Sequence, residues 1–266
     1  MRLTILCDNN VRTDTPYLGE AGFSVYIEDG DERILFDTGC SYVYRSNAEK
    51  MGIDLQKITA IVLSHGHYDH TGGLGYFPQS GRKVPLYAHP WAIFPKRFDS
   101  RNIGIPTDET MLRQLFDLRL SRGPVKLSPR LLFLGEIPRR SEEGRFPMGE
   151  CCADGIWQPD HLIDDSAIVY CGREGLYIIT GCSHAGIRNI VDYAKEVCGD
   201  HRILGILGGL HLVRASQRTD MAARWLGELG TQELRPCHCT CMAAKVAISA
   251  QSTIYETCVG DTIELL

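Results

Sequence analysis

The chain has 266 residues, of which 44% are apolar and 23% charged, and its formal net charge is -5. This length supports a sizeable core in one large domain or two small ones. The acidic balance excludes bulk attraction for nucleic acid or for an anionic membrane, and no apolar run reaches the ~20 residues that span a bilayer.

The cysteines and the N-terminal segment bear on the cellular compartment. The chain holds 11 cysteines, an odd number that would leave one thiol unpaired in a disulfide-bonded secreted protein. Its first residues show no charged leader and no long apolar run, and they are typical of a β-strand. We therefore expect a cytoplasmic protein with reduced thiols.

Strands and helices are expected to alternate in both halves of the chain. Apolar runs in the first half predict strands at residues 3–7, 23–28, 33–37, 58–64 and 84–89. A short helix is expected at 47–51, ending at Gly52. The second half predicts helices at 185–197, 220–229 and 243–249. Its strands are expected at 167–171, 176–180, 203–207, 234–237, 254–258 and 262–265.

This alternation predicts a layered α/β fold, with one domain over residues 1–266. Residues 91–160 interrupt the pattern, because they hold seven of the 12 prolines and many charges. One helix is expected there, at 111–120. We expect this stretch to form a lid or insertion beside the active site, and the alternative is a structural linker.

The most informative feature of the sequence is a histidine cluster directly after the predicted strand at 58–64. His65, His67 and His70 lie within six residues, with Asp69 between them. Histidines two residues apart in extended backbone point to the same side, so both rings can approach one ion. Imidazole and carboxylate groups bind zinc or iron, and two ions ~3.5–4 Å apart can share a hydroxide. The cluster therefore predicts a two-metal site.

Residues 65–70 resemble the His-x-His-x-Asp-His signature of the metallo-β-lactamase superfamily, and residues 36–39, with Asp37, resemble its first motif. The resemblance implies a four-layer αββα sandwich of two pseudo-repeated halves. Segments 7–10, 180–187, 208–212 and 238–240 are similar to one branch of that superfamily. The branch includes the dihydropterin-methyl-ribofuranosyl-aminobenzene 5'-phosphate synthases and related metal-dependent hydrolases.

The resemblance also implies ligands from the second half of the chain. His184 is the favoured ligand after the strand at 176–180, and His238 is favoured for the C-terminal position. His211 is the alternative there, and otherwise it faces the substrate or supports a ligand. Cys182 stands where the superfamily has a bridging aspartate. It is either a thiolate ligand or, as we favour, a small buried residue at a tight turn.

Two further residues complete the candidate site. Asp37 is expected to orient a metal-binding histidine through a hydrogen bond. His89 ends the predicted strand at 84–89 on the same edge of the sheet, and either contacts the substrate or has a structural role.

The implied function is that of a metal-dependent hydrolase. Two divalent ions, with zinc favoured over iron or manganese, would lower the pKa of a shared water to about 7. The resulting metal-bound hydroxide would attack a phosphoester or another ester-like bond. Asp69 is the catalytic candidate, since it would orient this nucleophile and carry its proton.

Two other functions stay open. The branch resemblance implies a transferase of pterin biosynthesis, which condenses a dihydropterin diphosphate with an aminobenzene ribofuranosyl phosphate. Di-iron redox chemistry is less favoured, because the sequence shows no flavodoxin-like segment. In each case the expected partner is a small molecule, for which a phosphate group is one option, and neither nucleic acid nor a membrane is expected.

Overall fold

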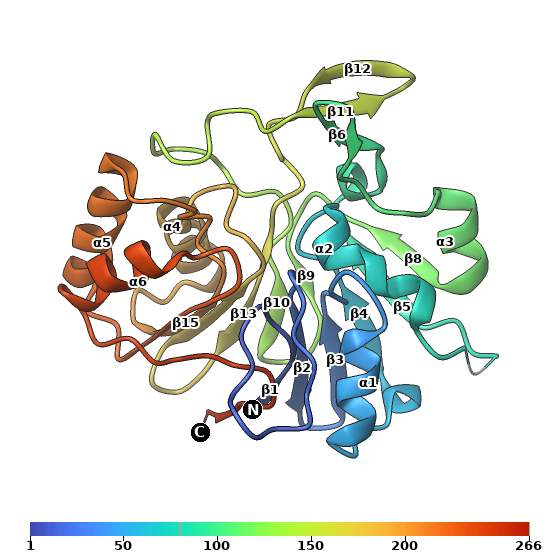
Figure 1. The fold of residues 1–266 in the computed structure, drawn as a ribbon, viewed down its shortest axis with the longest axis horizontal. Helices are drawn as coiled ribbons and strands as arrows, with labels where there is room; N and C mark the ends of the chain where they lie inside the picture. Colours follow the sequence, from blue (N-terminus) through green and yellow to red (C-terminus); the bar gives the residue numbers. More distant parts are fainter. Residues whose placement is uncertain (80, 266) are drawn as a thin grey trace.

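Two β-sheets pack face to face at the centre of the molecule, and helices cover both outer faces (Figure 1). The computed structural model describes residues 1–79 and 81–265. The helices over the first sheet are α1 (Val43–Lys50), α2 (Tyr68–Thr71) and α3 (Glu109–Leu115). The helices over the second sheet are α4 (Ile187–Cys198), α5 (Gln217–Leu229) and α6 (Met242–Ser249). These four layers form the αββα sandwich that the sequence predicts.

The first sheet has seven strands, and its central strands are parallel. In spatial order they are β17 (Thr262–Glu264), β1 (Arg2–Cys7), β2 (Ser24–Asp29), β3 (Glu32–Phe36), β4 (Ala60–Val62), β5 (Pro85–Ala88) and β8 (Asp117–Leu120). The second sheet has six strands. They are β16 (Glu233–Pro236), β15 (Ile203–Gly208), β14 (Leu176–Thr180), β13 (Ala167–Cys171), β10 (Leu131–Phe133) and β9 (Val125–Lys126).

The two sheets repeat one pattern of pairing. In the first sheet an antiparallel hairpin, β2–β3, is followed by the parallel strands β4 and β5. In the second sheet the hairpin β13–β14 is followed by the parallel strands β15 and β16. The carboxyl ends of parallel strands lie on the same edge of a sheet. The loops after these strands hold the candidate site residues, three loops from each half.

Adjacent residues on the strands pack into different cores, since successive side chains point to opposite faces of a sheet. Phe36 and Ile179 lie in the core between the two sheets. Their neighbours Leu35 and Ile178 pack outward, into the two cores beneath the helices. Central strands buried on both faces explain why these segments are continuous apolar runs in the sequence.

Residues 91–160 are divided among three sheets and do not form one continuous insertion. They contribute β8 to the first sheet and β9 and β10 to the second. A separate four-stranded sheet, ordered β12 (Ile156–Pro159), β11 (Glu150–Ala153), β6 (Lys96–Phe98) and β7 (Arg101–Asn102), projects from the top of Figure 1. The helix predicted at 111–120 is wrong in its second half, because Phe116 leaves helical geometry and β8 pairs in parallel with β5.

Two other predicted elements differ from the structure. Helix α1 begins at Val43, before the predicted start, and buries residues at helical spacing from there to Ala48. The strand predicted at 254–258 is wrong, since only Ile254 makes a β-bridge, with Leu234 of β16.

Three short 3₁₀ helices lie in the loops of the first half. They are η1 (Leu55–Lys57), η2 (Gly72–Tyr76) and η3 (Pro90–Ile93). Within residues 1–79 and 81–265, no helix has both the length and the apolar character needed to cross a bilayer.

Candidate metal centre

Side chains with metal-binding atoms gather where strands of both sheets end. Four of them follow β4, two follow β14 and one follows β16. Six are buried, and Asp69 is half-buried. The seven are His65, His67, Asp69, His70, Cys182, His184 and His238. The structure thus brings together all six predicted ligands, together with Cys182.

His65, His67 and His184 form a first group of imidazoles. His65 Nε2 lies 3.0 Å from His67 Nδ1, and the His184 ring centroid lies 4.8 Å from that of His65. His184 Nε2 is buried and has no hydrogen-bond partner among the described residues. Buried polar atoms in proteins are nearly always hydrogen-bonded. Converging imidazole nitrogens without partners therefore fit a cation site.

Asp69, His70 and His238 form a second group. Asp69 Oδ2 lies 3.7 Å from His70 Nε2 and 3.4 Å from His238 Nε2. His238 Nε2 is buried and makes no hydrogen bond within the part of the chain that the structure describes. One carboxylate oxygen and two imidazole nitrogens are the donor types that zinc and iron accept.

Cys182 lies between the two groups. Its thiol approaches the second group at His70 Nε2, 3.1 Å away. Its Sγ also lies within 4.8 Å of the ligand atoms of His65 and His184 in the first group. Burial and the neighbouring Cys239 raise the pKa of this thiol, so a thiolate here requires a nearby cation. Cys182 is buried in the turn after β14, as the sequence analysis favours, and its thiol also lies within reach of both groups.

Asp37 orients two of the histidines from the end of β3. Its Oδ2 accepts a hydrogen bond from His70 Nδ1 at 2.7 Å and another from Ser64 Oγ at 2.7 Å. Because the Ser64 hydroxyl proton is directed to Asp37, its oxygen accepts from His65 Nδ1, 2.9 Å away. These bonds fix the tautomers of both histidines and leave each Nε2 free to face the cluster.

The N-terminal loop orients His238 in the same way, which the sequence analysis missed. Asn9 Oδ1 accepts a hydrogen bond from His238 Nδ1 at 3.0 Å. Asp8 Oδ2 accepts from the His238 backbone N–H, also at 3.0 Å. The sequence signals for this role were the polar run directly after the first strand and the similarity of segment 7–10 to one branch of the superfamily.

Replacing Asn9 by alanine is expected to weaken zinc binding at His238 by about 10- to 100-fold, since the His238 ring loses its orienting acceptor. Titration with Zn²⁺, followed by calorimetry, would measure this. The matched control is Asn9→Asp, which keeps an acceptor and should bind with nearly normal affinity. Equal affinities for Asn9→Ala and the unaltered protein would contradict this role.

Burial and neighbouring charges set the protonation states of the cluster. Burial lowers the pKa of His67 to about 4 and that of His65 and His184 well below the ordinary value. These imidazoles are therefore neutral at neutral pH, which is the metal-binding form. Burial alone would raise the pKa of Asp69, but His70 and His238 outweigh it and lower that pKa, so Asp69 is ionised.

The backbone at the cluster is held in an unusual conformation. Asp37, Ser183, His211 and His238 all have positive φ, between 46° and 58°. Left-handed backbone at a residue other than glycine costs on the order of 1–3 kcal/mol, and such residues gather at functional sites. In each case the strained residue lies in a loop just after a strand that leads to the cluster.

Residues 18–194, more than half of the chain, match the sequence profile of the metallo-β-lactamase superfamily. The chain belongs to the metallo-β-lactamase superfamily. The resemblance of residues 65–70 to its signature is thereby confirmed.

Three known proteins are similar to this chain over nearly its whole length. An uncharacterized protein of Methanocaldococcus jannaschii, MJ0448, is 34% identical over 98% of this chain and 99% of its own length. The 7,8-dihydropterin-6-methyl-4-(beta-D-ribofuranosyl)-aminobenzene-5'-phosphate synthase of the same organism is 28% identical over 90% of this chain and 87% of its own. The crystal structure of Tm1679, described as a metal-dependent hydrolase of the β-lactamase superfamily, superposes with a TM-score of 0.87. It is 30% identical and covers 100% of this chain and 99% of its own.

The two remaining predicted histidines lie differently in this metallo-β-lactamase fold. The His211 ring centroid is 4.3 Å from that of His184, but His211 belongs to neither ligand group. His89 uses both ring nitrogens in structural bonds: Nδ1 accepts from Trp91 N at 3.1 Å, and Nε2 contacts Glu136 at 3.1 Å. Of the two roles left open for His89, the structure supports the structural one.

A buried ion network supports the metallo-β-lactamase signature loop, and no sequence pattern predicted it. Lys96 Nζ donates to Asp160 Oδ2 at 2.7 Å and to Asp164 Oδ1 at 3.0 Å, and all three side chains are fully buried. The second oxygen of Asp164 accepts from the backbone N–H of Gly66 at 2.8 Å. Residue 66 lies between the first two histidines of the signature, so this network fixes their backbone.

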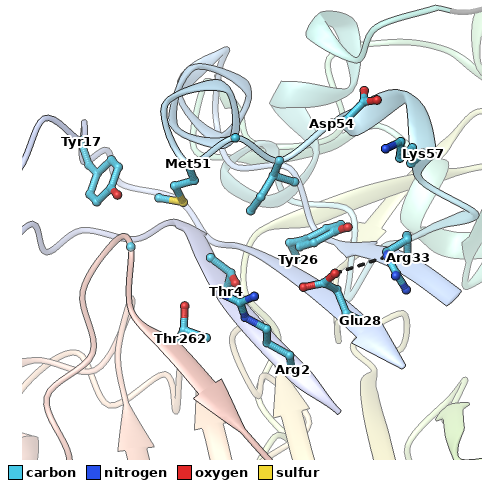
Figure 2. Close-up of a pocket in the computed structure, with 13 residues that line it drawn as sticks. Arg2, Thr4, Tyr17, Tyr26, Glu28, Arg33, Met51, Asp54, Lys57 and Thr262 are labelled. Carbon is cyan, nitrogen blue, oxygen red and sulfur yellow. Dashed lines mark ion pairs between the residues drawn. The ribbon is translucent and has the colours of Figure 1, made fainter. Parts of the chain in front are cut away.

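A cavity of about 500 Å³ lies at the other end of the first sheet, away from the metal cluster (Figure 2). It is lined by Arg2 near the start of β1, by Arg33 near the start of β3 and by Lys57 of η1. Arg33 forms an ion pair with Glu28 at 3.3 Å. The candidate ligands follow the opposite ends of the strands, so this cavity is not part of the metal centre.

Proposed function

We propose that the cluster holds two divalent metal ions and that the protein hydrolyses a phosphoester or another ester-like bond. His65, His67 and His184 would bind the first ion. Asp69, His70 and His238 would bind the second. Cys182 would bridge the two, and its thiolate, a soft ligand, favours zinc over manganese.

One observation carries this proposal: nitrogen, oxygen and sulfur atoms of seven side chains converge in a buried site. They fall into three overlapping groups, and the ligand atoms of each group lie within 4.8 Å of one another. A cation would satisfy the Nε2 atoms of His184 and His238, which are buried and make no hydrogen bond with any described protein group. Such desolvated, convergent donors would be costly without an ion.

Divalent ions held by these side chains would supply Lewis acidity, which lowers the pKa of a coordinated water and neutralises charge that develops on the substrate. Asp69 is the only carboxylate among the seven. Its ionised oxygen is therefore the group that orients the attacking water and accepts its proton. Burial and the charge of Arg218 lower the pKa of His211 to about 4, so His211 is neutral at neutral pH and donates a hydrogen bond to the substrate.

Metal analysis and a hydrolysis assay together test the proposal. Protein purified without chelators, or reconstituted with Zn²⁺, should contain about two metal ions per chain. It should release 4-nitrophenol from 4-nitrophenyl phosphate or from bis(4-nitrophenyl) phosphate, and lose this activity after treatment with a chelator. Fewer than one ion per chain after reconstitution would overturn the proposal.

The bridging role of Cys182 gives a separate prediction. Cys182→Ala removes one ligand from both ions, and zinc affinity should fall by at least the 10- to 100-fold that loss of a supporting residue costs. Cys182→Asp restores an anionic ligand and should retain two ions. The measurement is the zinc content after dialysis against graded concentrations of a competing chelator. If Cys182→Ala retains two ions as tightly as the unaltered protein, the thiol only fills space.

The second candidate function is transfer of the kind named for the Methanocaldococcus synthase, which is 28% identical over 90% of this chain. In that reaction a dihydropterin diphosphate would condense with an aminobenzene ribofuranosyl phosphate and release pyrophosphate. The same cluster would then stabilise the leaving diphosphate. Release of pyrophosphate only when both partners are supplied would favour transfer over hydrolysis.

A further inference from the structure

A second cavity, of about 350 Å³, opens between the loop at residues 142–146 and helix α5. One wall is the loop at residues 142–146, with Gly144 and Phe146. The other wall is the first turns of α5, with Gln217, Arg218 and Met221. This volume lies within the range of roughly 300–1,000 Å³ that is typical of small-molecule sites.

Both walls contact segments that carry histidines of the centre. A Cβ added to Gly144 would lie 2.6 Å from the backbone oxygen of His184, so the loop packs directly on that residue. On the other wall, α5 begins at Gln217, six residues after His211, so the loop that carries His211 leads directly into this wall. The rings of His211 and His184 are 4.3 Å apart. Both walls of the cavity are therefore connected to the segments that carry His184 and His211.

The lining of this cavity combines apolar surface with one unpaired cation. The side chains of Phe146 and Met221 are 82% and 54% exposed, although both are large and apolar. Arg218 makes no ion pair or side-chain hydrogen bond with any described residue. The two acids of the loop are engaged: Glu142 pairs with Arg145 at 2.7 Å, and Glu143 accepts a hydrogen bond from a backbone N–H.

The N-terminal end of α5 also attracts negative charge. Arg218 lies in the first turn of this 13-residue helix, where the helix dipole favours anions. An exposed apolar surface beside an unpaired guanidinium is suited to bind a ligand that has both an apolar part and a negative charge.

We propose that this cavity binds the organic group of the substrate, and that this group is aromatic and carries a negatively charged substituent. The ring would pack against Phe146 and Met221, the anionic substituent would pair with Arg218, and the phosphoester would face the metal cluster. This inference rests on the proposed hydrolysis of a phosphoester, and it names the substrate class for that site.

Binding of inert analogues tests the cavity without relying on turnover. Both phenylphosphonate and 4-carboxyphenylphosphonate have an aromatic ring and a phosphonate that can bind the metal ions. Only the second also has a negatively charged carboxylate on the ring. Titration calorimetry on the Zn²⁺-reconstituted protein should show the carboxylated compound binding about tenfold more tightly, as expected for one charge-assisted hydrogen bond. Arg218→Met should remove this preference.

Arg224→Met is the matched control, because Arg224 is an exposed residue of the same helix outside the cavity lining. It should keep the tenfold preference. Phe146→Ser should weaken both aromatic compounds and leave methylphosphonate unchanged. Equal binding of the two aromatic compounds by the unaltered protein, a preference retained in Arg218→Met, or no binding of either compound would each overturn the inference.

The outcome is separable from that of the proposed hydrolysis. Ester cleavage without a charge preference at Arg218 would overturn the cavity assignment and leave the hydrolase proposal standing. If the protein prefers 4-carboxyphenylphosphonate through Arg218 but cleaves no ester, the assignment of the cavity stands and the proposed hydrolase activity is wrong.

Discussion

Replacing Asp69 by asparagine is expected to lower kcat/KM for phosphoester hydrolysis by about 1,000-fold or more. The amide keeps the size of the side chain but loses the negative charge next to His70 and His238. Its oxygen can neither bind a divalent cation as strongly nor accept a proton from the nucleophile. Steady-state kinetics and metal content, measured on the same sample, would separate loss of chemistry from loss of metal.

Asp192→Asn provides the control for this change, since Asp192 is an exposed aspartate of α4. That protein should keep its full activity. An Asp69→Asn protein that retains two ions and more than a tenth of the normal rate would contradict the role assigned to Asp69.

Lys96→Met is expected to lower the free energy of unfolding by about 3–5 kcal/mol. The side chain of Lys96 is fully buried and pairs with Asp160 and Asp164, which are also fully buried. Methionine fills a similar volume but leaves two carboxylates without a countercharge. Urea unfolding, followed by circular dichroism, measures the loss.

The control for Lys96→Met removes the charges on both sides. Adding Asp160→Asn and Asp164→Asn should recover part of the stability, because no unpaired charge is then buried. An amide at 164 can still accept from Gly66 N–H and so support the signature loop. If Lys96→Met alone unfolds at the normal urea concentration, the network contributes no net stability and our account of it is wrong.

The ligand cluster shows which features of the site can be predicted from local sequence. The spacing of His65, His67 and His70 predicted a shared site because neighbouring residues take their relative positions from local backbone geometry. The apolar runs around them predicted the central strands, since strands buried on both faces are apolar throughout. Edge elements were less predictable. The strand β8 forms because β5 offers it a free edge, and no local pattern in residues 117–120 shows that.

Local sequence patterns did not predict the residues that support the ligands and the signature loop. Asn9 and His238 are 229 residues apart in sequence and meet only because β1 and β16 end near the same point. Lys96 and Asp164 are 68 residues apart, and each alone has the sequence context of an ordinary surface charge. Their pairing depends on how the small sheet of β6 and β11 packs over the signature loop.

Apolar periodicity and the spacing of residues 65–70 predicted the layered α/β fold and the histidine cluster, because both depend on local sequence. The resemblance to the superfamily, carried by short motifs, predicted the αββα sandwich and the six candidate ligands. Only the tertiary structure decided that Cys182 lies between the two ligand groups, that Asn9 and Asp37 fix histidine tautomers, and that a cavity between the loop at residues 142–146 and α5 exposes Arg218. These features arise from contacts between distant segments, and the stacking of the two sheets sets them.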